Sequence, residues 1–171
     1  CYAILWGLWL ATHPAAAETG ASTYQLGSGD VISIKVYGEE ELNFEEVLLT
    51  EAGTMSFPFL GLIRVKGKTA NELEDVITLG LKDDYLLHPR VSVSIINYRP
   101  FFVNGEVNTP GGFAYQPGLT LRKAIAIAGG LTERASRSKM FVIRDKDPGR
   151  QTQDIRMDSS IEPGDIVTIE Q

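Results

Sequence analysis

Apolar and polar residues alternate along several short stretches of the chain, and this pattern predicts a protein rich in β-strands. In residues 31–36, Ile32, Ile34 and Val36 alternate with Ser33 and Lys35, which is the two-residue period of a half-buried strand. The same alternation returns over residues 91–98. We expect further short strands over residues 46–50, 54–65, 101–107, 113–115, 140–144, 152–156 and 165–170.

Two segments follow the period of an α-helix instead. The first begins after Thr69, where Glu72 completes the T-x-x-E spacing of a capping box, and it extends to about residue 81. The second follows Thr120, a predicted N-cap, and ends before Gly129-Gly130. Either of these glycines can take the left-handed conformation that closes a helix.

The dipeptide Arg99-Pro100 divides these elements into two units. Residues 24–98 form a β-rich unit with one helix. Residues 99–171 follow the order β-β-α-β-β-β, which predicts a single helix packed on a small mixed sheet. We therefore expect an α+β protein of two small domains, with residues 18–23 as a linker in front of them.

A Gly-Asp pair precedes an alternating strand twice, as Gly29-Asp30 and as Gly164-Asp165. At each place we expect a turn in which the Asp carboxylate accepts hydrogen bonds from backbone N–H groups two residues further on. A pair of carboxylates is also the equipment of a glycosidase, so Asp30 and Asp165 admit a catalytic interpretation. We prefer turn capping.

The N-terminal segment has the layout of a secretory signal. Residues 2–11 are apolar and uncharged, His13-Pro14 follows them closely, and three alanines then precede Glu18 as an A-x-A cleavage site. We expect residues 1–17 to be a signal peptide whose own start is missing. A core helix and a lipidated Cys1 are the alternatives, and the lipidated form would also lie beyond the inner membrane of a bacterium.

Charge and reactive side chains narrow the function. The 171 residues carry 22 acidic and 16 basic side chains, a net charge of -6, without the Lys and Arg cluster that nucleic-acid binding requires. One cysteine and two histidines are too few for a zinc site. We therefore expect no metal, no cofactor and no enzyme, and we interpret His88 as a residue at a helix end or turn.

Aromatic residues gather around the boundary between the two units, and most of them belong in the core by default. Aromatic rings can also stack on the apolar faces of sugars. An exposed subset beside basic or amide side chains would then contact a glycan. The candidate contacts are Tyr98, Arg99, Asn104, Tyr115 and Arg122.

The second unit resembles the soluble-ligand-binding β-grasp (SLBB) domain. The resemblance rests on V-x-G-x-V-x-x-P-G over residues 103–111, on A-G-G-L over residues 128–131 and on the segments 140–144 and 162–167. Within it, Gly105 lets another backbone or a helix approach its strand, and Pro110-Gly111 suits the centre of a type II turn. Residues 24–32 and 89–93 resemble the polysaccharide export domain that precedes it, so the resemblance covers nearly all of residues 24–171.

This pair of domains is similar to the outer-membrane polysaccharide export family, the Wza-like exporters. The resemblance implies a homo-oligomeric ring in the periplasm, associated with the outer membrane. Such a ring passes an exopolysaccharide or capsule polymer outward from an inner-membrane copolymerase. Longer members continue into a pore helix, whereas this sequence stops at Gln171, so we expect a short form that depends on a separate outer-membrane β-barrel.

Two other functions stay open. The first is a monomeric periplasmic module that binds or senses glycans. The second is a glycan-cleaving enzyme, for which the sequence offers no convincing acid–base pair.

Overall fold

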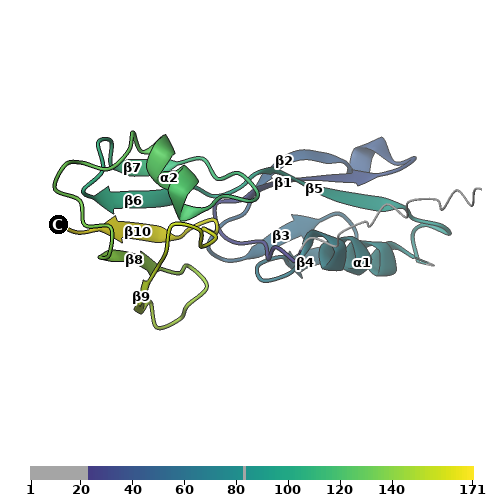
Figure 1. Ribbon diagram of the computed structural model, residues 1–171. Coiled ribbons are helices and arrows are strands. Elements are labelled where there is room, and N and C mark those ends of the chain that lie inside the picture. Colours follow the sequence, from purple (N-terminus) through teal and green to yellow (C-terminus); the bar gives the residue numbers. More distant parts are fainter. Residues whose placement is uncertain (1–22, 83) are drawn as a thin grey trace, which may run out of the picture.

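The structure, a computed structural model, describes residues 23–82 and 84–171, and Figure 1 shows two lobes that lie end to end. The predicted signal peptide, residues 1–17, lies outside the described residues. Each lobe has a hydrophobic core of its own, and the two cores share no residue. We call residues 24–97 the N-terminal lobe and residues 101–170 the C-terminal lobe. The helices and strands of both lobes confirm the α+β class.

The N-terminal lobe places its core between a three-stranded antiparallel sheet on one side and a helix with a hairpin on the other (Figure 1). The sheet has the order β2-β1-β5, and the hairpin pairs β3 with β4. The bounds are β1 Val31–Val36, the 3-10 helix η1 Glu40–Leu42, β2 Phe44–Leu48, β3 Thr54–Phe57, β4 Gly61–Arg64, α1 Ala70–Leu81 and β5 Val91–Asn97. Ile32, Ile34 and Val36 are buried as their alternation predicts.

Helix α1 begins as its sequence predicts. The Thr69 side chain accepts a hydrogen bond from the Glu72 N–H at 3.2 Å, and the Glu72 carboxylate accepts one from the Thr69 N–H at 2.7 Å. This is the complete capping box. Leu73, Ile77 and Leu81 bury one face of the helix against the sheet.

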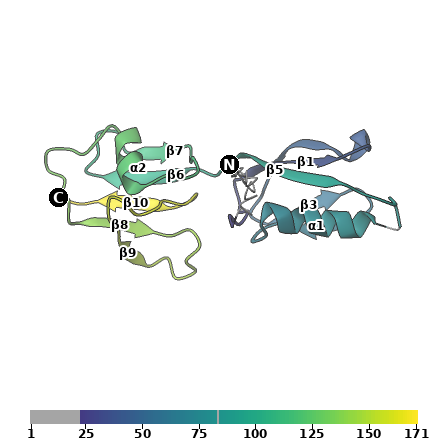
Figure 2. The same ribbon diagram turned by 45° about the vertical axis from the view of Figure 1, so that its right-hand side comes forward.

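The C-terminal lobe is a five-stranded mixed sheet with one helix, in the predicted order β-β-α-β-β-β (Figure 2). The strands lie in the order β7-β6-β10-β8-β9, with β10 parallel to β6 and antiparallel to β8. The bounds are β6 Phe101–Gly105, β7 Gly111–Phe113, α2 Leu121–Ile127, β8 Met140–Ile143, β9 Thr152–Asp154 and β10 Ile166–Ile169. Leu121, Ala124 and Ala128 join one face of this sheet in the core.

Thr120 is the N-cap of α2, but its side chain makes no capping hydrogen bond. The carbonyls of Ser159 and Met157 instead accept hydrogen bonds from the N–H groups of Leu121 and Arg122, at 3.0 and 2.9 Å. A neighbouring segment therefore satisfies these N–H groups, which a local side chain usually does.

The C-terminus of α2 has the glycine ending that the sequence predicts. Gly129 and Gly130 have φ angles of 79° and 89°. The Gly130 N–H donates to the Ile125 carbonyl at 2.8 Å and the Gly129 N–H to the Ala126 carbonyl at 3.1 Å. These two bonds make up a Schellman motif.

The predicted type II turn at Pro110-Gly111 is wrong. Gly111 has a φ of 158°, close to extended, whereas the third residue of a type II turn needs about +80°. Gly111 is instead the first residue of β7, paired with Val103, so this strand begins two residues before the predicted one. Gly112 faces Phe102 across the pair, and the Phe102 ring occupies the space that a Cβ at position 112 would need.

Gly105 behaves as predicted, because a Cβ at this position would collide with the backbone of Ile169 in β10. Other predicted strands shift by a few residues: 46–50 becomes β2, and 54–65 becomes the hairpin β3-β4 with Pro58 in its turn. Within the described ranges, no helix is long and apolar enough to cross a bilayer.

Candidate functional site at the junction of the two lobes

The two Gly-Asp pairs form matching turns at the ends of the lobes that face each other. The Asp30 N–H donates to the Gly27 carbonyl at 3.3 Å, and the Asp165 N–H to the Glu162 carbonyl at 3.2 Å. Gly29 and Gly164, at the third position of each turn, have φ angles of 91° and 86°. Pro163-Gly164 thus has the proline and glycine of a type II turn, the turn type that is predicted at Pro110-Gly111.

Both aspartates are buried, and each caps its own turn, though not in the predicted direction. The carboxylate of Asp30 accepts the Gly27 N–H and that of Asp165 accepts the Glu162 N–H, each at 2.8 Å. These donors lie three residues before the Asp, whereas we expected donors two residues after it. The reason is that the turn folds its first residue back over the side chain of its last.

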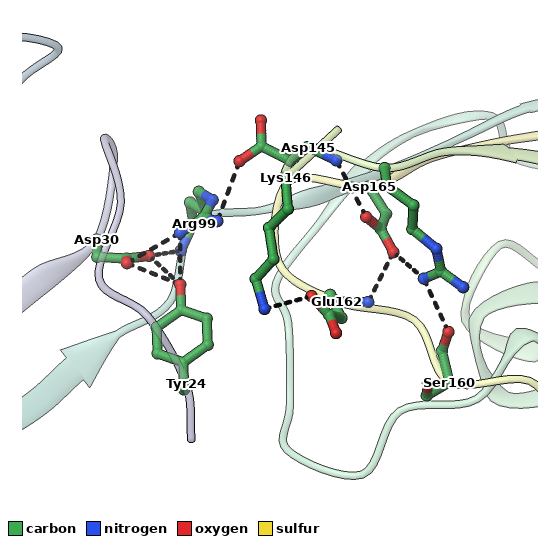
Figure 3. Close-up of polar contacts among 9 residues, drawn as sticks. Tyr24, Asp30, Arg99, Asp145, Lys146, Ser160, Glu162 and Asp165 are labelled. Atoms are coloured by element: carbon green, nitrogen blue, oxygen red, sulfur yellow. Dashed lines mark hydrogen bonds and ion pairs between the residues drawn. The ribbon is translucent and has the colours of Figure 1, made fainter. Parts of the chain in front are cut away.

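Arg99, between the two lobes, binds the first turn (Figure 3). Its backbone N–H donates to one oxygen of Asp30 at 2.8 Å, and its Nη1 lies 3.1 Å from the other oxygen. The same Nη1 donates to the Tyr24 hydroxyl at 2.6 Å, and that hydroxyl in turn donates to the Asp30 carboxylate at 2.7 Å. Arg99 is 8% exposed and Asp30 is fully buried, so this ion pair is shielded from water.

The other end of the guanidinium reaches the C-terminal lobe. Arg99 Nη2 lies 3.0 Å from Asp145, which directly follows the Arg144 that pairs with Asp165. The Asp145 N–H also donates to Asp165. Figure 3 shows Arg99 between Asp30 and Asp145, so one side chain joins the two turns across the junction.

Three glycines of these turns make room for Arg99. A Cβ at Gly27 would collide with the guanidinium, one at Gly29 would lie 3.2 Å from Arg99 Cβ, and one at Gly164 would lie 2.9 Å from Arg99 Nε. The glycines therefore serve a turn and also the packing of an arginine that lies far from them in the sequence.

Tyrosine rings continue the contact between the lobes. Tyr98 lies edge-on to Tyr24, with 5.0 Å between ring centroids, and to Tyr115 of the C-terminal lobe, with 5.3 Å. Burial is the main cause that raises the pKa of Tyr24, and its hydrogen bond to the Asp30 carboxylate raises it further. Burial likewise raises the pKa of Tyr115. Both phenols therefore stay neutral at ordinary pH.

A cleft opens beside this junction. One hollow of about 560 Å³ is lined from the N-terminal lobe by Ser28 and Lys66 and from the C-terminal lobe by Lys146 and Arg150. A second hollow of about 350 Å³ shares Ser28 and Arg150 with the first and adds Phe102. The volume is that of a small-molecule site, and its walls carry charged and aromatic groups.

The five predicted glycan contacts do not form one site. Tyr98 and Tyr115 touch each other and lie half-buried, and Arg99 is buried in its ion pairs, which leaves it unavailable to a polymer. Arg122 is exposed on α2 and pairs with Asp158 at 3.1 Å. Asn104 is exposed on β6, next but one to Phe102. Of the five, Arg99 is the one that lines the cleft.

Sequence reasoning missed Lys66 and Arg150 as cleft residues, because nothing in their local pattern connects them with each other or with Phe102. It also missed the part played by Arg99. The signal that was available is the pair of matching Gly-Asp turns on either side of a single Arg-Pro boundary.

The arrangement does not offer a catalytic carboxylate pair. Asp30 and Asp165 each form an ion pair with an arginine, and each carboxylate accepts hydrogen bonds from two backbone N–H groups. Neither therefore presents a free acid or base to a substrate. His88 is exposed in a bend after α1. The described part of the chain holds no group of three metal-ligating side chains.

Comparison with known proteins assigns a family to each lobe. Residues 18–96 match the polysaccharide biosynthesis/export protein family, and residues 100–154 match the SLBB domain. The boundary between the two matches falls at the segment that contains Arg99.

Three curated relatives are consistent with the polysaccharide biosynthesis/export family match. The exopolysaccharide production protein ExoF of Rhizobium meliloti (strain 1021) is 32% identical over 77% of this chain and 35% of its own length. The EPS I polysaccharide export outer membrane proteins EpsA of Ralstonia nicotianae and Ralstonia solanacearum are 30% and 29% identical, each over 88% of this chain and 48% of its own length. The chain thus spans about half or less of each relative. With both family matches on consecutive lobes, the chain belongs to the polysaccharide biosynthesis/export protein family and carries an SLBB domain.

Proposed function

We propose that the protein is a non-enzymatic component of a bacterial machine that exports exopolysaccharide or capsule polymer, located in the periplasm and associated with the outer membrane. The observation that carries this proposal is the match of the two lobes to the export family and to the SLBB domain. The relatives named for exopolysaccharide production and for polysaccharide export support it. The commitment of Asp30 and Asp165 to arginines supports a role without catalysis.

In this proposal residues 24–98 and 99–171 are two domains held at a set angle, and copies of the chain assemble side by side into a ring. Heterologous contacts of this kind close when the rotation per subunit divides the circle. Large apolar side chains that stand 61–77% exposed on the N-terminal lobe support such contacts, since burying them is favourable. They are Leu48, Phe59, Leu62, Leu79 and Leu87.

The ring would receive polymer from an inner-membrane copolymerase and deliver it to a separate outer-membrane β-barrel. Deleting the gene and measuring polysaccharide on the cell surface and in the periplasm tests the proposal. We expect polymer to disappear from the surface and to accumulate in the periplasm, and the wild-type gene to reverse both changes. Normal surface polysaccharide in the deletion strain would contradict the proposal.

A monomeric module that binds glycans in the periplasm is the second candidate, and the cleft at the junction favours it. Sedimentation of the purified chain separates the two. A species that stays monomeric at all concentrations and binds oligosaccharide would support the module. Assembly into a closed oligomer would support the ring.

A further inference from the structure

The cleft between the lobes has a charge that differs from that of the whole chain. The chain has a net charge of -6, yet four basic side chains line the larger hollow against two acidic ones, Glu51 and Asp145. Arg99 is shared between Asp30 and Asp145, and Lys146 pairs with Glu162 at 2.7 Å. Among the described residues, Lys66 and Arg150 have no ion-pair partner. Two exposed cations, one from each lobe, therefore face the cleft together with the exposed carboxylate of Glu51.

The backbone holds Lys66 in place. Its N–H donates to the Gly53 carbonyl at 3.0 Å, and its aliphatic stem lies where a side chain at position 53 would have to go. The turn at Gly53 thus packs against the aliphatic part of the Lys66 side chain, and the ammonium group is exposed at the rim of the cleft.

The backbone of Arg150 is also held by a hydrogen-bonded turn. The carboxylate of Asp147 accepts the N–H groups of Gly149 and Gln151, at 2.9 and 3.0 Å, and the Arg150 N–H donates to the Asp147 carbonyl at 3.0 Å. Arg150 has a φ of 45°, a conformation that costs an ordinary residue about 1 kcal/mol or more. Residues held in this way are found disproportionately at binding sites.

An apolar wall adjoins these cations. The face of the sheet opposite α2 carries Phe102 on β6, Ile166 on β10 and Ile143 on β8, which are paired side by side. All three line the smaller hollow together with Arg150, and Phe102 is 42% exposed. Asn104 follows Phe102 on the same face of β6 and extends this wall with an amide.

We propose that this cleft binds a segment of an acidic saccharide, with Lys66 and Arg150 holding its carboxylates and Phe102 stacking on the apolar face of a sugar ring. Cations supply charge-assisted hydrogen bonds to carboxylates, the Ser28 hydroxyl supplies a neutral hydrogen-bond partner, and the ring supplies an apolar contact that water disfavours. A neutral sugar or a small inorganic anion uses only part of this set. The identification of the ligand as an exported polymer rests on the proposed function, whereas the site itself does not.

Binding of purified oligosaccharides to the full chain tests this site. The probes are a short oligomer of glucuronic acid, the glucose oligomer of the same length and inorganic phosphate, each titrated by calorimetry. We expect the acidic oligomer to bind more tightly than the other two, and its affinity to fall as salt is added. Equal affinity for the glucose oligomer, or for phosphate alone, would overturn the assignment.

The double variant Lys66→Gln/Arg150→Gln isolates the two cations. We expect about a tenfold loss of affinity for the acidic oligomer, as for two charge-assisted contacts on an exposed rim. The matched control is Arg137→Gln/Lys139→Gln, which removes two exposed cations that do not line the cleft and should leave the affinity unchanged. Equal loss in both double variants would show a general charge effect and overturn the site.

Chemical-shift mapping on the wild-type chain gives an answer that does not depend on a variant. We expect the acidic oligomer to perturb Ser28, Lys66, Phe102 and Arg150, and perturbations confined to other residues would contradict the proposal. A chain that restores export in the deletion strain but binds no oligomer would keep the proposed function and overturn the cleft assignment alone.

Discussion

The guanidinium of Arg99 lies 3.1 Å from the carboxylate of Asp30, a residue 69 positions earlier in the chain, and both side chains are buried. The same guanidinium pairs with Asp145 of the other lobe, so the contact that stabilises one turn also joins the two lobes. Removing one partner of a buried ion pair destabilises the folded state strongly, because the remaining charge stays in an environment that solvates it poorly. The pair is therefore open to a direct test.

Asp30→Asn should lower the free energy of unfolding by about 3–5 kcal/mol, since it leaves Arg99 as a buried charge without its main partner. Denaturant unfolding followed by circular dichroism measures this. The matched control is Asp145→Asn, which removes a partner that is 37% exposed and should cost about 1 kcal/mol or less. Similar losses in both variants would contradict the central place given to Asp30.

Gly164→Ala tests the space that the turn leaves for Arg99. The new Cβ would lie 2.8 Å from Asp145 and 2.9 Å from Arg99 Nε, so we expect overpacking on top of backbone strain. Gly118 has a similar φ of 76° with open space around it, and Gly118→Ala therefore reports the strain alone. We expect Gly164→Ala to be less stable than Gly118→Ala by about 1–3 kcal/mol in thermal unfolding. Equal stabilities would mean that Arg99 does not need this glycine.

Tyr24→Phe should cost about 1–3 kcal/mol at neutral pH, because the hydroxyl bonds to the charged groups of Asp30 and Arg99. The cost should shrink at alkaline pH. Burial and Asp30 raise the pKa of Tyr24 in the folded chain above the usual value of 10.0. The folded chain therefore keeps this proton while the unfolded chain loses it, and the stabilisation is present below pH 10.0 and lost as the pH rises further.

To check the Tyr24 prediction, the free energy of unfolding of wild type and of Tyr24→Phe is measured between about pH 8 and pH 11. Wild type should lose stability more steeply than Tyr24→Phe above about pH 10. Parallel curves would show that Tyr24 does not titrate with folding.

The two N-cap threonines should respond differently to alanine. Thr69→Ala removes the side chain of a complete capping box and should cost about 0.5–2 kcal/mol. Thr120→Ala should cost less, only a few tenths of a kcal/mol. The reason is that the carbonyls of Ser159 and Met157 already accept hydrogen bonds from the first N–H groups of α2. Urea unfolding of both variants checks this, and a larger loss in Thr120→Ala would contradict the capping that we describe for α2.

Local patterns were sufficient for much of the fold. The alternation in β1 and β5, the capping box at Thr69 and the glycine ending of α2 depend on residues within about six positions of each other, and each is confirmed. Two of the errors arose where another segment competes with a local preference. Pro110-Gly111 has good turn residues, but pairing with β6 draws Gly111 into a strand. Thr120 is a good N-cap residue, but carbonyls of residues 157–159, and not its side chain, accept the hydrogen bonds of the first N–H groups of α2.

The sequence by itself therefore determined the α+β class, the order of the elements, the two matching Gly-Asp turns and the resemblance to polysaccharide export proteins that the family matches confirm. Only the tertiary structure decided what those turns hold. Tyr24 and Asp30 meet Arg99 and Asp145 from three separate segments, and Lys66 and Arg150 line one cleft at the same junction. Hydrophobic period and turn chemistry act over a few residues, whereas a buried charge selects its partner by proximity in the folded chain.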